Sequence, residues 1–345
     1  MEIINPNGKK TLSVATDWLG RELKLEVNRV GFRSTASVMV SYGETVVLGS
    51  VVVGTKPVVQ DFFPLSIDYE EKFYAAGKIN GSKFIKREGR PSDDAILIGR
   101  LIDRPIRPLF PKGYRQEVQV VTTVLSLDPN FRPDCIAMLA ASTALMIAGV
   151  PFDGPIAGLR IGRLNSEFKA FLTPEEQKAS PLDLVVACKD GRVMMVEAGA
   201  NEVPEETIIE AMHWAVKNVQ PVLDLQRELA RQINTKQQEY ELVLPSEEIQ
   251  KEVTEWTKSR FGSKVRGNVM ERAQMLDDIK YAMHDEMSLK YGEGETDNEK
   301  VKWYDENLRD VYDQAFELAV NAEVRRGIVE DGVRPDNLAD RKSVV

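Results

Sequence analysis

One long and almost wholly apolar segment limits most strongly what this chain can fold into. It reads CIAMLAASTALMIAG from Cys135 to Gly149 and leaves no polar stripe for solvent. A helix that is apolar on nearly every side is buried, and its alanine and serine side chains permit close packing against a sheet. Arg132, Pro133 and Asp134 open this helix, and Gly149 is suited to end it because glycine tolerates the left-handed conformation. The sequence therefore predicts a core helix enclosed by other elements.

Strand-like segments lie on both sides of this helix. Runs such as ELKLEV and SVMVSYGETVVLGSVVV alternate with a period of two residues, and Gly43 and Glu44 have the character of a hairpin turn. A closing amphipathic helix is predicted from Pro204, with a break or kink at Pro221. This order predicts an α+β domain that ends near Gln238. The predicted strands lie within residues 12–53 and at residues 65–69, 117–127, 156–161, 182–188 and 192–197.

Residues 244–324 differ in composition from the residues before them. They contain few β-branched runs and many Glu, Lys and Arg residues. Apolar residues recur at helical spacing, as at Ile249, Val253 and Trp256. We predict a small bundle of about three helices, with a loop at residues 292–297.

A locally basic segment lies within a chain whose net charge is -9. It reads GKINGSKFIKREGRPSDDAILIGRLIDRPIRPLFP from Gly77 to Pro111. Before Pro91, glycines and polar residues predict a mobile loop with Phe84 and Ile85 near its tip. The cations of this segment are Lys78, Lys83, Lys86, Arg87, Arg90, Arg100, Arg104 and Arg107.

The second half of this segment predicts a helix. Ser92 is a good N-cap because its hydroxyl can accept from an otherwise unpaired amide, and the two aspartates that follow suit the positive end of the helix dipole. The helix should extend to about Arg104, since Pro105 disfavours helical geometry in the residue before it. Arg100 and Arg104 then share a face, and Arg107 projects from the exit of the helix.

The basic segment has two interpretations. An aromatic tip beside cations suits single-stranded nucleic acid, because every base offers a stacking face and every nucleotide a phosphate. Arginine adds a planar group that matches phosphate. The alternative is a solvated loop and an arginine helix with internal ion pairs, for which Asp103 is an available partner. Because the whole chain is acidic, any RNA site must be local.

The cysteines and the hydropathy indicate the compartment. Cys135 and Cys188 do not make a disulfide framework, and both lie in apolar runs where buried thiols are expected. The polar start of the chain lacks the apolar region of a signal peptide, and no stretch approaches the length that spans a bilayer. We therefore expect a cytoplasmic location and no membrane partner.

Three stretches of this chain closely resemble one enzyme family. They are DFFPLSIDYEEKFYAAGKI from Asp61, KREGRPS, and RLIDRPIRPLFP. They are similar to the first ribonuclease-PH-like repeat of the bacterial polyribonucleotide nucleotidyltransferases, also called polynucleotide phosphorylases. The similarity extends in weaker form over essentially the whole chain. It implies a ribonuclease-PH-like α+β domain, with a mixed sheet and packed helices, followed by a small all-helical domain.

The resemblance also implies domain limits. Residues 1–240 would form the first ribonuclease-PH-like domain, residues 241–324 the all-helical domain, and residues 325–345 a truncated entry to a second repeat. Family members usually carry an Arg-x-Asp-Gly-Arg wording in this last stretch, where this chain reads RPDNL from Arg334. We therefore expect the chain to be a fragment, without the second repeat and without the two small RNA-binding modules of the family.

The same resemblance implies partners and RNA contacts. Members of the family form a trimeric ring, and the counterpart of residues 84–87 constricts its central RNA channel. That counterpart is usually two phenylalanines and two arginines, so Ile85 here replaces one ring. We expect single-stranded RNA and a homotrimer as partners, and inorganic phosphate in the full enzyme. The predicted RNA-binding residues are Phe84, Lys86, Arg87, Arg100, Arg104 and Arg107.

The resemblance places the chemistry of phosphorolysis in the second repeat, where a serine-rich loop binds phosphate and paired aspartates support Mg²⁺. The corresponding places here are DPNFRPDC from Asp128, which has no serine cluster, and EEQKASPLDLVV, where Pro181 stands at the position of an essential aspartate. Glu175, Glu176 and Asp183 are the nearby carboxylates, for which a solvated loop and a strand end are favoured. We assign no catalytic residue and no metal ligand to this chain, and expect the Mg²⁺ ligands in the second repeat.

The histidines offer no other machinery. His213 and His284 are far apart in sequence, and no Cys/His spacing indicates a metal or a nucleophile. Structural or surface roles are expected for both.

Two hypotheses for function follow. In the first, the chain is the N-terminal portion of a 3′-to-5′ phosphorolytic exoribonuclease that degrades RNA, including mRNA, to nucleoside diphosphates. This portion would bind and thread single-stranded RNA and build the ring, with little or no phosphorolysis of its own. The alternative is a non-enzymatic RNA-binding or ring-assembly module in which the arginines serve subunit contacts.

Overall fold

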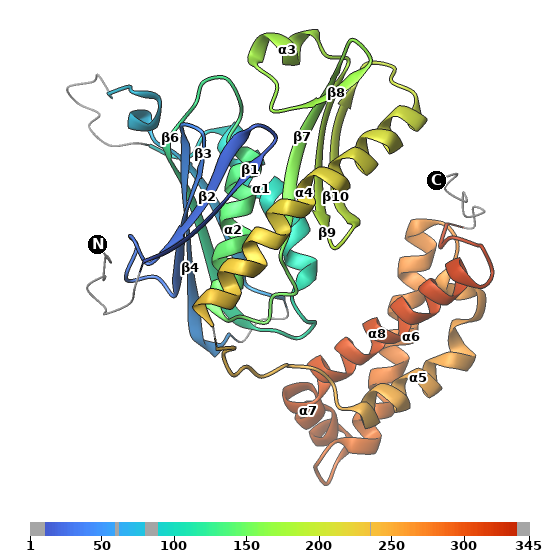
Figure 1. The fold of residues 1–345 in the computed structure, drawn as a ribbon. Coiled ribbons are helices and arrows are strands. Elements are labelled where there is room, and N and C mark those ends of the chain that lie inside the picture. The colour runs from blue at the N-terminus through green and yellow to red at the C-terminus, as the bar shows by residue number, and fades with distance from the viewer. Residues whose placement is uncertain (1–10, 59–61, 80–88, 235, 337–345) are drawn as a thin grey trace. The chain divides into compact units, whose positions relative to one another are not determined.

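The structure, a computed structural model, describes residues 11–58, 62–79, 89–234 and 236–336 (Figure 1). The chain divides into two compact units between Leu242 and Val243. Each unit has a hydrophobic core of its own. Among the described residues, no helix combines the length and the apolar character that crossing a membrane requires.

The first unit contains two sheets. The six-stranded sheet has the order β1-β2-β3-β4-β6-β5, in which β5 and β6 are parallel and all other neighbours are antiparallel. The four-stranded sheet is antiparallel, with the order β10-β9-β7-β8. The predicted mixed sheet is therefore confirmed. The strands are β1 Leu12–Trp18, β2 Arg21–Val27, β3 Ala36–Tyr42, β4 Thr45–Pro57, β5 Leu65–Glu71, β6 Gln116–Ser126, β7 Ala157–Leu164, β8 Glu167–Ala170, β9 Leu182–Lys189 and β10 Arg192–Ala200.

Helices connect and cover these sheets (Figure 1). Helix α2 contacts β3, β4 and β6 of the larger sheet and β7 of the smaller one, while α1 contacts β5 and β10. Helix α4 contacts β1 of the larger sheet and β7, β9 and β10 of the smaller one. The two sheets are thus joined by helices that touch both. The helical elements are η1 Phe73–Ala76, α1 Asp93–Ile106, η2 Arg107–Leu109, α2 Asp134–Ala148, α3 Pro174–Ala179 and α4 Glu205–Ile233.

Helix α2 is the predicted core helix. Residues 134–145 and Ala148 are buried, and Gly149 ends the helix in the left-handed conformation with φ of 76°. Its packing against β4 is close, because a Cβ atom built on Gly49 would lie 2.7 Å from the carbonyl oxygen of Ala140. Two predictions, the buried helix and its glycine stop, are confirmed.

The six-stranded sheet covers α2 with one face only. Along β4, Val47 and Val51 are buried, whereas the alternate residues Val46, Leu48 and Ser50 are partly exposed. Neighbouring Met39 of β3 shows the same partial exposure as its cross-strand partner Leu48. The outer face of this sheet therefore carries apolar side chains that no described helix buries completely.

The first and last elements of this unit meet. The indole nitrogen of Trp18, at the end of β1, donates to the carbonyl oxygen of Asn218 in α4 at 2.7 Å. Trp18 is 2% exposed and packs against the rings of Tyr42 and Phe171. The hairpin at Gly43 is confirmed by the pairing of Tyr42 with Thr45.

Several local predictions were wrong. Helix α1 continues through Pro105 to Ile106, and Pro221, where a break or a kink was predicted, does not break α4. A proline inside a helix removes only one backbone donor, and burial of the apolar face of each helix compensates for that loss. Strand β8 was not predicted, and α3 lies where a loop was expected, because both are short and largely polar.

The second unit is a helical bundle with more helices than predicted. Four α-helices are described in it where about three were expected, and α8 runs beyond the predicted end at residue 324. The loop after Gly292 is confirmed. Val253, Met283 and Phe316 lie in its core. The elements are α5 Glu247–Phe261, η3 Gly262–Val265, α6 Val269–Tyr291, α7 Asp297–Asn307 and α8 Arg309–Val329.

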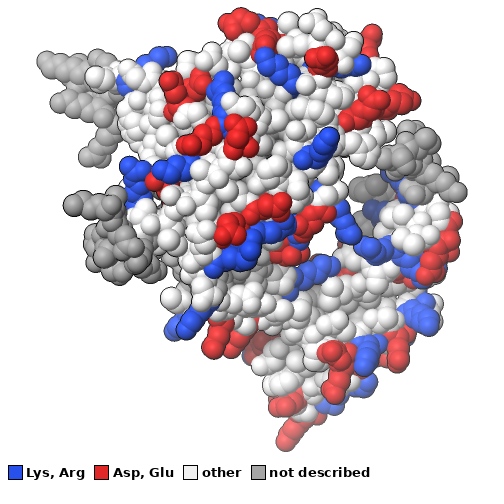
Figure 2. Space-filling view, viewed as in Figure 1, with Lys and Arg blue, Asp and Glu red and all other residues white. Residues whose placement is uncertain are grey.

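Charged side chains of both signs are interspersed on the face shown in Figure 2. Many of them are paired, as Arg227 is with Asp224 at 2.9 Å. Exposed pairs of this kind contribute little to stability. The cohesion of each unit therefore comes mainly from its apolar core.

Gly49→Ala is predicted to destabilise the first unit. The added methyl group meets the backbone of α2, which cannot move without disturbing both sheets, so the free energy of unfolding should fall by about 1–3 kcal/mol. The measurement is chemical denaturation followed by circular dichroism. Gly89→Ala is the matched control, because a Cβ atom there has no neighbour within 4 Å. Equal stability of the two variants would contradict the packing described for α2.

Candidate nucleic-acid interface

The predicted RNA-binding residues fall into two groups. Phe84, Lys86 and Arg87 lie outside the described residues. The three arginines of the second group, Arg100, Arg104 and Arg107, are described, and all are exposed on α1 or directly after it. Each of the three has different surroundings.

Helix α1 is held by its cap and its apolar face. The Ser92 hydroxyl accepts a hydrogen bond from the amide of Ala95 at 3.1 Å, as predicted for an N-cap. Ile98, Ile102 and Ile106 are buried against the first unit. The opposite face, with its arginines, is thereby presented to solvent.

Arg107 fastens the end of α1 to strand β5. Its guanidinium donates to the Asp103 carboxylate at 2.8 and 2.9 Å and to the carbonyl oxygens of Phe63 and Leu65 at 3.1 and 3.0 Å. All three of its nitrogens are engaged in this way. An RNA phosphate at Arg107 would compete with these contacts, so the main role that the geometry gives this residue is anchoring.

Arg104 joins α1 to the smaller sheet. It forms an ion pair with Glu197 of β10 and donates to the carbonyl oxygen of Val196 at 3.4 Å. Half of the Arg104 side chain remains exposed, at 50%. The residue can therefore meet a ligand while it holds α1 against β10.

Arg100 is the arginine with the greatest freedom. Within the described residues it makes no hydrogen bond or ion pair that would hold its guanidinium. It lines a hollow of about 330 Å³ between β5 and α1, together with Gly99, Asp103 and Arg107. The hollow also has carboxylates, from Asp68 and Glu70. Arg107 is bound to Asp103 and is therefore less available to a ligand. Of the two arginines in this hollow, Arg100 is the one that can bind a phosphate.

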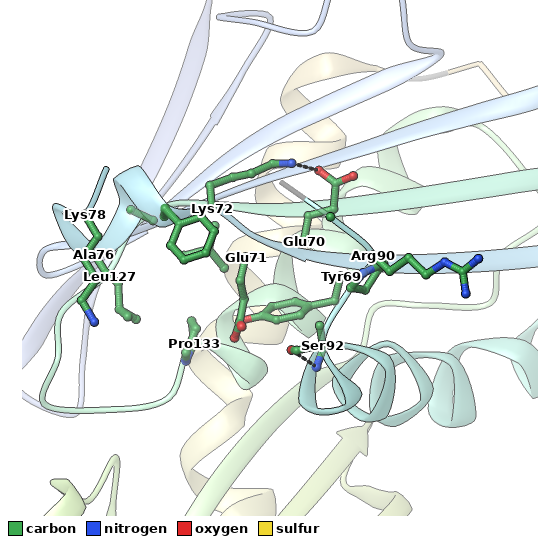
Figure 3. A pocket seen from close by; sticks show the side chains of 16 residues that line it. Tyr69, Glu70, Glu71, Lys72, Ala76, Lys78, Arg90, Ser92, Leu127 and Pro133 are labelled. Carbon is green, nitrogen blue, oxygen red and sulfur yellow. Dashed lines mark hydrogen bonds and ion pairs between the residues drawn. The ribbon is translucent and has the colours of Figure 1, made fainter. Parts of the chain in front are cut away.

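A larger hollow adjoins this one at the start of α1 (Figure 3). Its volume is about 570 Å³, and Tyr69 and Pro91 line both hollows. The Tyr69 hydroxyl donates to the Glu71 carboxylate at 3.2 Å. Burial, followed by the charge of Glu71, raises the pKa of Tyr69 above its usual range, so the phenol stays protonated and keeps this bond.

The carboxylates examined for catalysis are bound to cations. Arg160 of β7 forms an ion pair with Asp134 and two further bonds to Asp183, at 2.7 and 2.8 Å. Gln177 also donates to Asp183, at 2.9 Å. The cavity beside this network holds only about 10 Å³. Neither a phosphate nor a hydrated metal ion has room there.

The pKa of Asp183 reflects this network. Burial alone would raise the pKa, but the hydrogen bonds and charge of Arg160 outweigh burial and hold the pKa of Asp183 below its usual value. Glu176 is also committed, because it closes a capping box with Thr173 and pairs with Lys169. These carboxylates are structural ion-pair partners in the geometry described.

The histidines have structural or surface positions. His284 is buried in the second unit, where its ring nitrogens lie 3.0 Å from the Tyr304 hydroxyl and 2.9 Å from Asp313. His213 is exposed on α4. Across residues 11–58, 62–79, 89–234 and 236–336, no group of three or more His, Cys, Asp or Glu side chains is placed to hold a metal ion.

Two consecutive parts of the chain match one known family of enzymes. Residues 20–151 match domain 1 of the 3′ exoribonuclease family, the ribonuclease PH family, and residues 154–218 match its domain 2. The chain belongs to the 3′ exoribonuclease family. Its two matched domains correspond to the two sheets, since domain 1 contains β2 to β6 and domain 2 contains β7 to β10.

Curated relatives show which members of this family the chain is similar to. The chain is 38% identical over 332 residues to the polyribonucleotide nucleotidyltransferase of Natranaerobius thermophilus, which covers 96% of this chain and 46% of that protein. It is 40% identical over 324 residues to the enzyme of the same name from Staphylococcus aureus strain JH9, covering 93% of this chain and 45% of that protein. The predicted resemblance is confirmed, and the chain spans less than half the length of these relatives.

A solved structure also aligns with the chain. The crystal structure of rice (Oryza sativa) Rrp46 matches with a TM-score of 0.49 and 14% sequence identity. The alignment covers 66% of this chain and 97% of that one.

The sequence did not indicate the arginine that binds Asp134 and Asp183, or the residues that shape the larger hollow. Arg160 was not singled out, although an arginine inside an apolar strand indicates a buried carboxylate partner. Tyr69 and Glu71 lie within the stretch that carries the family resemblance, but nothing in that stretch indicated a hollow, which forms because the end of β5 lies next to the start of α1. As predicted, one region holds the three described arginines, Arg100, Arg104 and Arg107. They differ in how many hydrogen bonds and ion pairs hold each guanidinium.

Asp183→Asn is predicted to weaken the first unit in a pH-dependent way. Because the folded pKa is lowered, the carboxylate stabilises the fold above its unfolded pKa of about 3.9, and this contribution is lost as the pH falls through the folded value. The variant should lose about 1–2 kcal/mol of unfolding free energy at pH 7, a figure discounted for partial exposure of Asp183. Denaturation at pH 7, 5 and 3.5 measures it.

The difference between the two proteins should shrink below about pH 4, as the native carboxylate becomes protonated. Asp224→Asn serves as the control, because Asp224 pairs with Arg227 while its own side chain is 60% exposed. A difference that widens on acidification would show that Arg160 does not stabilise the charged form of Asp183.

Proposed function

We propose that this chain is the RNA-binding part of a phosphorolytic 3′-to-5′ exoribonuclease of the polyribonucleotide nucleotidyltransferase type. Single-stranded RNA passes along α1 and the residues before it, and the chain takes part in a homotrimeric ring in the cytoplasm. The observation that carries the proposal is Arg100, an exposed cation without a partner among the described residues, which lines the smaller of two adjoining hollows. Family membership supplies the class of reaction.

The three described arginines divide the work in this proposal. Arg107 fixes the end of α1 on β5, and Arg104 fixes the same helix on β10. Arg100, one turn before Arg104 on the solvent face, is then held in place by the rigidity of the helix and meets phosphate with its planar guanidinium. Phe84, Lys86 and Arg87, outside the described residues, are proposed to contact the same strand of RNA.

Bond cleavage is proposed to belong to sequence outside these residues. The Arg160 network argues for this division, because the guanidinium lies where a metal ion or phosphate would need open carboxylates or amides. Asp134 and Asp183 are therefore unsuited to hold Mg²⁺. In the proposed full enzyme, Mg²⁺ and inorganic phosphate bind in a second repeat and act in RNA degradation, including that of mRNA.

A second candidate function is ring assembly without catalysis. The outer face of the six-stranded sheet favours it, because Met39, Leu48 and Val46 are apolar and only partly buried. Apolar sheet faces of this kind are commonly covered by another subunit or domain. The two functions are compatible, and they differ in what Arg100 does.

Arg100→Glu is predicted to weaken RNA binding. Reversal of one charge at a phosphate contact should lower the affinity for poly(A) several-fold and reduce the slope of log K against log salt by about 0.7. Fluorescence anisotropy at several salt concentrations measures both quantities. Arg231→Glu is the matched control, since that side chain is 74% exposed on α4. If affinity is unchanged while the oligomer dissociates, the arginine serves assembly.

Arg104 allows a sharper version of the same experiment. Arg104→Glu alone removes a cation and also places two carboxylates together beside Glu197. The double variant Arg104→Glu, Glu197→Arg restores the ion pair with its charges exchanged. Recovery of stability without recovery of RNA affinity is the expected result, and recovery of both would assign Arg104 to packing alone.

The chain itself is predicted to show little or no phosphorolysis. Purified free of host enzyme and supplied with poly(A), Mg²⁺ and inorganic phosphate, it should release almost no ADP, because its internal carboxylates are closed by Arg160. Chromatography of the released nucleotides is the measurement. Robust release of ADP that depends on phosphate would overturn the division of labour proposed here.

A further inference from the structure

The larger hollow at the start of α1 has a chemistry that phosphate binding alone does not use. Its walls are largely apolar, from Phe73, Pro91, Leu127 and Pro133. Its volume of about 570 Å³ lies within the range of small-molecule sites. A flat aromatic ligand can be accommodated between such walls, and Phe73, which is 49% exposed, offers a ring for stacking.

A single carboxylate lies at the centre of these walls. Figure 3 shows the Glu71 side chain beside the Tyr69 ring, with Pro133 on the other side. The Tyr69 hydroxyl donates to one Glu71 oxygen at 3.2 Å and so fixes the orientation of the carboxylate. A carboxylate accepts about four hydrogen bonds, so both of its oxygens can still accept from a ligand.

The neighbouring acid does not share this role. Glu70 pairs with Lys72 at 3.1 Å, and the two side chains are directed toward each other in Figure 3, away from Tyr69. Glu71 has no ion-pair partner among the described residues. The ligand must therefore bring hydrogen-bond donors to Glu71.

Cations are present at the edge of the hollow. Lys78 and Arg90 line it and are both exposed. Figure 3 shows them at opposite ends of the hollow, with Tyr69 and Glu71 between them, so one of the two can meet the phosphate groups of a ligand whose flat part lies next to Glu71. An apolar slot with one acceptor and cations at its rim matches a nucleotide more closely than it matches free phosphate, which Glu71 would repel.

The acceptor also discriminates among the bases. The Watson–Crick edge of guanine presents two adjacent donors, N1–H and the 2-amino group, which a carboxylate can accept together. Adenine and cytosine each present a ring acceptor beside their amino group, and uracil presents one N–H between two carbonyl oxygens. An acceptor-only carboxylate repels those ring nitrogens and carbonyl oxygens. Guanine is therefore the base that fits Glu71.

We propose that the hollow around Tyr69 and Glu71 is a guanine-nucleotide site, in which Glu71 accepts from the guanine edge, Phe73 stacks on the base, and a cation at one end of the hollow, Lys78 or Arg90, meets its phosphates. The proposal deepens the proposed function. It rests on that function in one respect, which is that the hollow around Glu71 and the RNA contact at Arg100 belong to one nucleotide-binding surface. The guanine belongs either to a free nucleotide or to an RNA strand.

The test compares GDP with ADP on the full chain by isothermal titration calorimetry. GDP is expected to bind about 10- to 100-fold more tightly, the effect of charge-assisted hydrogen bonds that ADP cannot make. Glu71→Gln should abolish this preference, because an amide offers a donor in place of one acceptor. Glu167→Gln, on the exposed strand β8, makes the same chemical change elsewhere and should leave the preference intact.

Two further variants keep the outcome interpretable. Phe73→Ala should weaken GDP and ADP alike, while Tyr69→Phe should reduce the preference for GDP by releasing Glu71. Thermal unfolding of each variant reports whether the fold is kept, and Glu71→Gln is an exposed change that should leave it unaltered. Equal binding of GDP and ADP, absence of binding by both, or a preference that survives Glu71→Gln overturns the proposal.

Short oligonucleotides distinguish the two sources of guanine. If GDP competes with a guanine-containing oligonucleotide and not with an adenine-only one, the site takes guanine from RNA as well as the free nucleotide. If GDP displaces neither, the site serves the free nucleotide alone. Loss of poly(A) affinity in Arg100→Glu with GDP binding retained supports both proposals. Retained poly(A) affinity in that variant would refute the proposed RNA contact without touching the guanine site.

Discussion

Helix α2 packs so closely on strand β4 that Gly49 has no room for a side chain, and the layers of the first unit are placed by that contact. The helix is buried on nearly all sides, so it contributes apolar area to both sheets at once. With α2 fixed, α1 lies against β5 and β10, and the start of α1 meets the end of β5. Both hollows of the candidate interface lie at this junction. Their shape is therefore a consequence of core packing some distance away.

Charge is used in two opposite ways in this unit. Arg160 is largely enclosed and closes the internal carboxylates, since a buried charge is tolerated only with partners. Arg100 lies on the surface, has no such partner within the part of the chain that the structure describes, and is open to ligands. Arg104 and Arg107 stand between these extremes, because each stabilises the position of α1 and remains partly exposed. Helix α1 therefore carries both an arginine available to a ligand and an arginine that holds the helix in place.

The sequence predicted elements whose signal is local. The apolar run of α2, the N-cap at Ser92 and the turn at Gly43 each need only neighbouring residues, and each is found. The predicted helix end before Pro105 was wrong, and Pro221 does not break α4, because burial of a whole helix outweighs the loss of one hydrogen bond. The pairing of Tyr69 with Glu71 beside α1 could not be predicted, because the cavity around it is formed by segments distant in sequence. Family resemblance supplied the fold, but not which arginines are engaged.

The bond from Trp18 to Asn218 has a consequence for biosynthesis. It links the first described strand to a helix 200 residues later, so the indole nitrogen lacks this hydrogen-bond acceptor until almost the whole unit has been translated. At about 5–20 residues per second, that interval lasts at least about ten seconds. During that interval β1 lacks the cover that α4 gives it in the finished unit. The first unit can therefore complete its fold only after α4 has been synthesised.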